Sequence, residues 1–325
     1  MLRFLVRRAL GAIVILVLIS AVTYFLFFAL PADPALLSCG KNCGPQEVAL
    51  IHHNLGLDQP IPVQYWHYMV GLFVGRDMPI GHCDAPCFGF SFANQQPVWD
   101  IIKDRYPDTL TLAIMGAAIF LTIGVGLGLI SAAKQGKLFD KIASGVSLTG
   151  QSVQIYFIGP LAIYVLADQL GWLDHGHDVD WAHNPVGSIT GMLLPALVMS
   201  VIFWSNYSRQ TRSLMVEQLS EEHVRTARAK GMSSRYVFFR YALRGAMGPI
   251  VTIFGIDLGS VFGGAIITET TFGLHGIGQL AVQAVLQTDL PLEMGVMLFG
   301  ATAIVIFNVL IDASYAFIDP RVRLA

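Results

Sequence analysis

The chain has 325 residues, of which 54% are hydrophobic and 13% are charged, and its mean hydropathy is +0.60. A soluble globular domain carries roughly 25% charged residues, so this composition excludes an ordinary soluble protein and predicts a membrane protein. The formal net charge of −2 carries little information, because the charges are segregated along the chain.

Six apolar stretches are long enough to cross a bilayer, which takes about 20 helical residues. They cover residues 9–30, 109–133, 142–167, 185–208, 245–268 and 294–311. The first four contain no Asp, Glu, Lys or Arg, and the fifth contains only Asp257. We therefore predict an all-α polytopic membrane protein with six transmembrane helices.

The distribution of lysine and arginine predicts the orientation, because these residues concentrate on the cytoplasmic side of membrane proteins. All but four of the 20 lysines and arginines lie on one side of the predicted spans, and the exceptions are Lys41, Arg76, Lys103 and Arg105. Both termini are therefore expected in the cytoplasm. The N-terminal apolar run is longer than a signal-peptide core of about 7–15 residues, so we expect it to remain as the first span.

The predicted spans divide the chain into three parts. Residues 1–30 hold the cytoplasmic N-terminus and the first span, residues 31–108 form a large extracytoplasmic loop or cap, and residues 109–325 form a five-span core. This core includes a cytoplasmic loop at about residues 209–246.

The predicted outer loop contains the four cysteines of the chain, Cys39, Cys43, Cys83 and Cys87. An extracytoplasmic compartment is oxidising, so disulfides are expected, and four cysteines allow three pairings. The alternative is a metal site built from two C-x3-C units, which the C-x2-C spacing of most zinc sites disfavours.

The polar segment 224–249 is long for a connection between membrane helices, and such loops are usually functional. Ser220 is a possible N-cap for a helix whose first turn holds Glu221 and Glu222. Gly231 is placed to end that helix in a left-handed conformation. Taken alone, the basic side chains of the segment also fit simple anchoring at anionic lipid headgroups.

The spacing of this segment resembles the cytoplasmic docking loop of ATP-binding-cassette importer permeases, which reads E-A-A, three residues and Gly. Gly231 falls on that glycine, and Arg225, Thr226 and Ala227 fall on the three named positions. The variant R-T-A-R-A-K-G resembles the branch that carries dipeptides, oligopeptides and nickel, and further matches follow at 193–197, 209–213, 269–278 and 319–323. The resemblance implies an ATPase-docking role for Glu221, Arg225, Thr226, Ala227, Arg228, Ala229, Lys230 and Gly231.

The same resemblance implies a type I importer permease fold in the bacterial inner membrane, with a related second permease chain as heterodimer partner. It also implies two ATPase subunits that bind ATP and magnesium, and an extracytoplasmic substrate-binding protein. The sequence contains no phosphate-binding G-x4-G-K-[ST] loop, so the chain itself is expected to bind no cofactor and to be no enzyme. Nucleic acid is not an expected partner, because the basic residues follow the orientation rule.

Polar side chains inside a membrane are costly and usually face a wet path or the bundle interior. The candidates for a substrate path are Gln151, Ser152, Gln154, Asn206 and Asp257. For Asp257 the alternative is a contact that packs two helices. Gly124, Gly126 and Gly128 have the spacing of close helix packing rather than of a nucleotide fingerprint, since no soluble strand precedes them.

Two outer segments carry further candidates. A glycine-rich stretch after the fifth span predicts either a re-entrant gate or an ordinary solvated loop, and the gate residues would be Glu269, Phe272, Gly273, Gly276 and Gly278. A loop rich in histidine and aspartate offers His175, His177 and His183 as ligands for nickel or zinc. The alternative there is a solvated loop, because no fixed ligand spacing is visible.

The sequence therefore predicts a permease subunit that forms half of a pore for di- or oligopeptides by alternating access, coupled to separate ATPases. The alternatives are a permease of the same family for nickel or another small solute, or an ATP-independent channel or carrier. A carrier predicts paired intramembrane charges or matching broken helices in two halves, whereas Asp257 is alone. An intramembrane enzyme is disfavoured because the sequence has no H-E-x-x-H helix.

Overall fold

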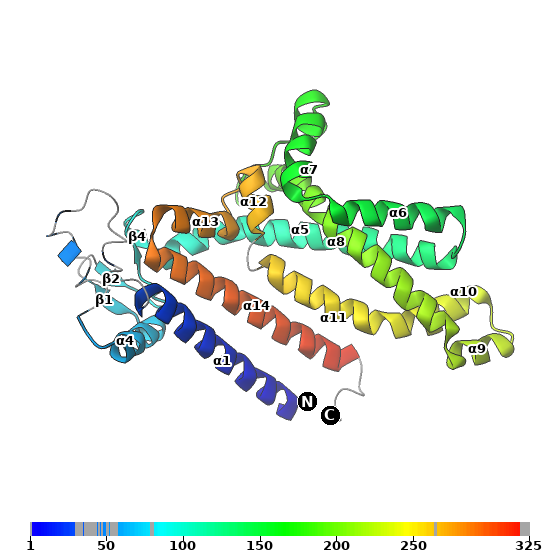
Figure 1. The fold of residues 1–325 in the computed structure, drawn as a ribbon, viewed down its shortest axis with the longest axis horizontal. Helices are drawn as coiled ribbons and strands as arrows, with labels where there is room; N and C mark the ends of the chain where they lie inside the picture. Colours follow the sequence, from blue (N-terminus) through cyan, green and yellow to red (C-terminus); the bar gives the residue numbers. More distant parts are fainter. Residues whose placement is uncertain are drawn as a thin grey trace.

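A computed structural model describes residues 2–29, 58–78, 81–262 and 265–318, together with a few single positions between 30 and 57. Figure 1 shows an elongated arrangement in which α1 (Leu2–Tyr24) and α14 (Leu290–Ile318) lie side by side, with α11 (Leu243–Phe262) next to α14. The longest helices are α5 (Val98–Ala133) and α8 (Pro185–Ser220), which pack against each other over a long contact.

Shorter elements complete the described part of the chain. The remaining helices are α4 (Ile61–Val74), α6 (Leu138–Ser152), α7 (Ile155–Ala162), α9 (Glu222–Ala229), α10 (Ser234–Val237), α12 (Ile266–Phe272) and α13 (Ile277–Gln287). The π-helical turns are η1 (Phe25–Ala29), η2 (Ile163–Gln169) and η3 (Phe238–Ala242). Two short antiparallel hairpins pair β1 (Arg76–Met78) with β2 (Gly81–Cys83) and β3 (Phe90–Ser91) with β4 (Gln96–Pro97).

The described residues contain five helices that are long and apolar enough to cross a membrane. They are Arg7–Phe28, Val98–Ala133, Pro185–Ser220, Ser234–Phe262 and Leu290–Leu310, and the bent pair Leu138–Ser152 with Ile155–Gln169 counts as a sixth span if taken together. The prediction of an all-α polytopic membrane protein is confirmed. Helices are the expected form, because lipid offers no hydrogen-bond partner to an open backbone.

The third predicted span, residues 142–167, is bent in the structure rather than one continuous helix. α6 and the helix made by α7 and η2 meet at an angle of 100°, and α7 stands away from the bundle in Figure 1. The two parts pack closely against different helices, α6 against α8 and α7 against α12. A Cβ on Gly150 would lie 2.1 Å from an α8 hydroxyl, and one on Gly159 would lie 2.5 Å from a methyl group of α12.

Span boundaries also differ from the prediction, and the fifth span ends at Phe262 rather than at residue 268, because residues 266–268 belong to the separate helix α12. The helix α5 begins at Val98 rather than at residue 109, because Val98, Ile101 and Ile102 continue an apolar helical face that is buried against α13 and α14. The helix α8 ends at Ser220 rather than at residue 208. At 36 residues it is roughly 54 Å long, well beyond a hydrocarbon core of about 30 Å.

Glycines set the distance between α5 and α8. A Cβ on Gly124 would lie 2.6 Å from Tyr207 Cβ, and a Cβ on Gly128 would lie 2.6 Å from Thr211 Cβ. A Cβ on Gly126 would meet nothing within 4 Å. The predicted close packing therefore holds for Gly124 and Gly128, which face α8, and not for Gly126.

The predicted cap is described mainly from residue 58 onward. Its helix α4 packs on α1, where the Tyr24 hydroxyl donates to Gln64 Oε1 at 3.2 Å and the Tyr24 and Tyr68 ring centroids are 5.6 Å apart. Cys83 and Cys87 are joined by a disulfide, which selects one of the three possible pairings. The other two candidate cysteines, Cys39 and Cys43, lie outside the described residues.

Candidate docking helix, outer gate and substrate path

The predicted docking helix, α9, has one buried and one exposed face. Val224 and Ala227, three residues apart, are buried in a cluster that includes Met215 of α8. Arg225 and Arg228 share the exposed side of the helix. The inner face anchors α9 to the membrane helices, and the outer face presents the positive charges.

A tight turn ends α9 at Gly231. The Gly231 amide donates to the Arg228 carbonyl at 3.0 Å, and the Met232 amide donates to the Ala227 carbonyl at 3.4 Å. These two hydrogen bonds form a Schellman motif, in which the residue after the C-cap, here Gly231, adopts the left-handed conformation. Gly231 has φ of +76°, and a Cβ there would meet nothing within 4 Å, so conformation rather than crowding favours glycine.

The start of α9 differs from the prediction. Glu221, not Ser220, is the N-cap, and it makes no side-chain capping bond. Ser220 instead ends α8, where its hydroxyl donates to the Glu217 carbonyl at 2.7 Å. The predicted cap therefore closes the preceding helix.

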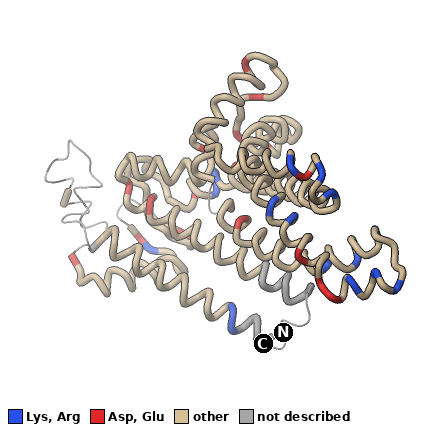
Figure 2. Tube along the Cα trace, turned by 45° about the vertical axis from the view of Figure 1, so that its right-hand side comes forward, with Lys and Arg blue, Asp and Glu red and all other residues tan. Residues whose placement is uncertain are grey.

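The exposed charges of α9 have no charged partner inside the described part of the chain. Arg225, Arg228 and Lys230 are exposed and form no salt bridge with another described residue. Figure 2 shows that most of the described lysines and arginines gather toward one end of the molecule, where α9 and α10 lie. This end is therefore a positively charged surface.

A half-buried ion pair that the sequence analysis missed lies near this end of the molecule. Arg212 of α8 donates through Nη2 to Asp140 Oδ2 at 2.7 Å, and Asp140 is 3% exposed. The Ser131 hydroxyl and the Gly136 amide also donate to Asp140. The pair ties the α5–α6 turn to α8. The sequence signal that could have revealed this pair was a lone aspartate next to the basic residues at 134–141.

The predicted outer gate is a packed structure rather than a solvated loop. The Glu269 side chain is 0% exposed and lies on α12. It accepts hydrogen bonds from the Thr109 hydroxyl at 2.8 Å and from the amides of Gly278 and Gln279 at 2.7 and 3.0 Å. Because those amides are in the first turn of α13, Glu269 caps that helix. Burial raises the pKa of Glu269, although these hydrogen bonds act to lower it.

Glycines allow this carboxylate to reach its donors. A Cβ on Gly276 would lie 2.3 Å from the Glu269 carboxyl group, and a Cβ on Gly278 would lie 2.6 Å from Ile266 Cα. Gly273 ends α12 in the left-handed conformation, and the Phe272 ring beside it is buried. The structure therefore brings the five predicted gate residues together.

Three of the five predicted path residues form two separate contacts around α8. Gln151 of α6 donates to Asn206 Oδ1 at 3.1 Å. Asp257 of α11 accepts from the Tyr207 hydroxyl at 2.9 Å, a partner that the sequence analysis did not predict. Ser152 and Gln154 lie at the break of the third span with exposed side chains. Asn206 and Asp257 therefore belong to different sides of α8.

The three predicted metal ligands are not brought together. His175 pairs with Asp168 at 2.7 Å, His183 pairs with Asp180 at 2.9 Å, and the His177 ring packs on the backbone of α8. Within the residues that the structure describes, no group of three His, Cys, Asp or Glu side chains can hold a metal ion. A metal site in this loop is therefore not supported, because each imidazole is engaged locally.

The fold is thus a set of helices long and apolar enough to span a membrane, with an exposed basic helix at one end, which is the arrangement expected of a permease subunit. Residues 1–113 match the family described as "Binding-prot-dependent transport system membrane comp, N-term", and residues 124–324 match "Binding-protein-dependent transport system inner membrane component". The chain belongs to this family of binding-protein-dependent inner membrane transport components.

Relatives match the chain over nearly its full length. A putative peptide transport system permease protein of Brucella abortus (strain 2308) is 34% identical over 319 residues, which are 98% of each chain. The glutathione transport system permease protein GsiC of Salmonella typhi is 32% identical over 323 residues, which are 99% of each chain. The chain is therefore similar to whole permease subunits of transport systems.

Proposed function

We propose that this chain forms half of the translocation pore of an ATP-driven importer for di- or oligopeptides. The observation that carries the proposal is α9, whose inner face is fixed to the bundle while its basic outer face has no charged partner among the described residues. Such a helix fits a groove on a separate ATPase, which supplies the ATP and magnesium chemistry that this chain lacks.

The packing supports a direct route for force from α9 into the membrane. Val224 and Ala227 bind α9 to α8, and α8 continues without a break to its outer N-cap at Asn184. The Asp140–Arg212 pair connects the same helix to α6. Movement of α9 would therefore tilt α8 and carry the spans between inward-open and outward-open states.

The exposed polar residues of the third span support a path beside another subunit. Gln154 lies exposed at the break of a span, where lipid would leave its amide unpaired, whereas the exposed Ser152 hydroxyl donates to the Leu148 carbonyl at 3.0 Å. A water-filled route between this chain and a related second permease removes that cost. Asn206 and Gln151 would line this route, while Asp257 would act through Tyr207.

The remaining partners of the proposed complex are two ATPase subunits and an extracytoplasmic binding protein. The family description, binding-protein-dependent transport, supports the last of these. The gathering of basic residues at the α9 end supports cytoplasmic termini. Peptide cargo is supported by relatives named for peptide and glutathione transport.

The test is purification of the tagged full-length chain from native membranes, with mass spectrometry of the proteins that accompany it. The double variant Arg225→Glu/Arg228→Glu should lose the ATPases and labelled-peptide uptake while it still inserts in the membrane. Lys137→Glu/Lys141→Glu is the matched control, since both lysines are exposed on the same side but lie away from α9. A wild-type chain without ATPases, or a reversed-charge variant that keeps them, would refute the docking role.

A further inference from the structure

The helix α4 carries an apolar face on the outside of the molecule. Residues three and four apart lie on the same face of a helix. This spacing joins five residues into one apolar stripe, namely Val63, Trp66, Val70, Phe73 and Val74. All five are exposed, and Trp66, Phe73 and Val74 reach 66%, 74% and 75% exposure. A surface helix of a soluble domain has the reverse arrangement, with its polar side chains outside.

The helix α4 also contains no charged residue. None of the positions in Ile61–Val74 is Asp, Glu, Lys or Arg, and His67 is the one polar side chain of the helix that is exposed. The amide of Gln64 is turned inward and buried. An uncharged apolar helix of about 10–14 residues is too short to cross a bilayer and is typical of a buried or an interfacial segment. Because the apolar stripe of α4 is not buried, the interfacial segment is the better match.

Charged side chains return directly after α4. Gly75 ends the helix with φ of +81°. The β1–β2 hairpin that follows carries Asp77 and Asp84, whose side chains are 93% and 92% exposed. The surface therefore changes from apolar to charged over a short stretch of chain, as expected where a protein passes from acyl chains into water.

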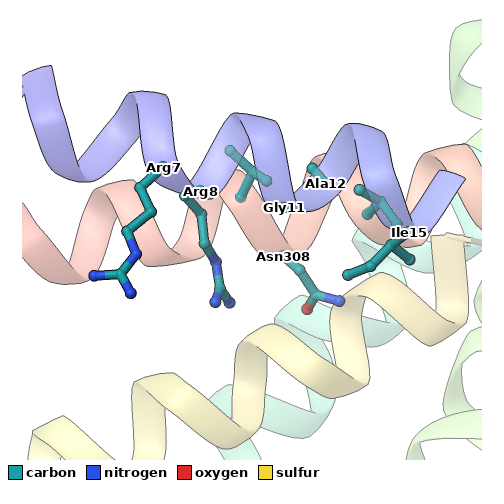
Figure 3. Close-up of a pocket in the computed structure, with 8 residues that line it drawn as sticks. Arg7, Arg8, Gly11, Ala12, Ile15 and Asn308 are labelled. Carbon is teal, nitrogen blue, oxygen red and sulfur yellow. The ribbon is translucent and has the colours of Figure 1, made fainter. Parts of the chain in front are cut away.

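The position of α4 along the first span indicates its depth. Figure 3 shows Arg7 and Arg8 on the N-terminal part of α1, at the start of a candidate span that ends at Phe28, whereas Figure 1 shows α4 at the other end of α1. The contacts with α4 lie between Val17 and Tyr24, roughly 16 and 6 Å before that end at about 1.5 Å per residue. Since one leaflet supplies about half of a roughly 30 Å hydrocarbon core, α4 lies level with a leaflet rather than above it.

Hydrogen bonds hold α4 at this level. The Ser20 and Tyr65 hydroxyls are 2.8 Å apart, and the Tyr65 hydroxyl donates to the Val17 carbonyl at 3.3 Å. The Tyr24 hydroxyl donates to Gln64 Oε1 at 3.2 Å. Polar groups within a membrane are costly unless they are paired, so these contacts are the kind that a position inside a leaflet requires.

The exposed apolar surface of α1 continues to this contact. Leu10, Val14 and Leu18 follow one another at four-residue intervals and are exposed, and so are Phe25 and Leu26 close to the α4 contact. An exposed apolar face of a spanning helix contacts acyl chains, which are as apolar as these side chains. Because α4 packs beside this surface, the lipid at this end of α1 also meets α4.

We propose that α4 is embedded in the leaflet at the C-terminal end of α1, with its apolar stripe against acyl chains. Helices of this kind bury their apolar faces roughly 5–10 Å into the boundary between headgroups and acyl chains. Trp66 would lie near the headgroups, where tryptophan is enriched, and the β1–β2 hairpin would lie in water. In the proposed orientation this is the extracytoplasmic leaflet. The inference needs only that α1 spans the membrane, and it uses neither the proposed ATPase docking nor the proposed peptide path.

The test measures the depth of a spin label at four positions of the full-length chain. The chain is purified with whatever subunits accompany it and is placed in vesicles of phosphatidylethanolamine and phosphatidylglycerol. Val70→Cys and Phe73→Cys carry the label in the apolar stripe. The controls are Val14→Cys on the exposed face of α1 and Asp77→Cys in the hairpin. The chain without an added cysteine gives the background from the native cysteines.

Oxygen concentrates among acyl chains, whereas a nickel chelate stays in water. We expect labels at positions 70 and 73 to collide with oxygen more often than with the chelate, as the label at position 14 should. The ratio of the two collision rates should be several-fold higher than at position 77. Positions 70 and 73 are exposed, so substitution by cysteine should leave the fold intact.

Two results would overturn the proposal. Preferential collision with the nickel chelate at either position would place the stripe in water, where it would be free to dock a soluble binding protein. Low collision with both reagents at either position would show that another part of the chain or another subunit covers the stripe.

Discussion

The predicted outer gate and the predicted docking helix both carry charged side chains, but in opposite environments. At the gate, Glu269 is buried and its carboxylate meets three donors of the same chain. At the docking helix, Arg225 and Arg228 are exposed and have no charged partner among the described residues. The carboxylate of the predicted gate is satisfied within this chain, whereas the basic face of α9 leaves its charges available to a partner outside it, as the proposed docking requires. Removing a charged side chain should therefore lower the stability of the fold at Glu269, and should weaken assembly with a partner at Arg225 and Arg228.

The largest expected effect on stability is at Glu269. Replacing it with alanine leaves two backbone amides and the Thr109 hydroxyl without an acceptor, which should lower the free energy of unfolding by about 3 kcal/mol. Thermal unfolding of the detergent-purified chain measures this. The milder variant Thr109→Val keeps the shape but removes one donor to Glu269 and the acceptor of the Ile277 amide, so it should cost about 2 kcal/mol. An unchanged midpoint in Glu269→Ala would show that the gate is not held by this carboxylate.

Smaller losses of stability are expected from substituting two glycines that are required for different reasons, Gly278 for space and Gly231 for its left-handed backbone. Gly278→Ala places a Cβ 2.6 Å from the Ile266 backbone and should cost about 2 kcal/mol through overpacking. Gly231→Ala has open space but a left-handed backbone, and should cost about 1 kcal/mol. Asparagine tolerates that conformation, so Gly231→Asn should be milder than Gly231→Ala, whereas Gly278→Asn should be no better than Gly278→Ala. Thermal unfolding of the four variants checks this ranking, and its reversal would contradict the assignment.

The smallest expected effect on stability is at the docking surface. Arg225→Gln/Arg228→Gln should leave the free energy of unfolding within about 0.5 kcal/mol of the wild type, because both side chains are exposed. The same purified samples should nevertheless retain less ATPase. A clear loss of stability would mean that these arginines serve the fold of this chain, and the contrast with Glu269 would disappear.

Local patterns predicted the spans and the end of α9, because both depend on neighbours in sequence. Apolar runs mark the helices, and Gly231 marks a turn that needs a left-handed residue. The bend of the third span escaped prediction, since it depends on where Gly150 and Gly159 approach α8 and α12.

The contacts of the candidate sites escaped prediction for the same reason. Glu269 was found as a candidate, but its partner Thr109 is 160 positions away in the sequence. Asp140 and Arg212 are 72 positions apart, and Arg212 was visible only as a positive charge near a membrane boundary. Pairings over such distances are created by helix packing, which a single sequence does not display.

The glycine contact between α5 and α8 has a consequence for the order in which the protein is made. Gly124 and Gly128 enter the membrane with α5, long before the ribosome has synthesised Tyr207 and Thr211. During that interval the bent third span is inserted, and it must not pack against the surface of α5 at Gly124 and Gly128 that α8 later covers. A nascent chain that stalls before residue 207 would leave the Gly124 and Gly128 surface of α5 exposed to lipid and to other proteins, and this exposure would distinguish it from the completed chain.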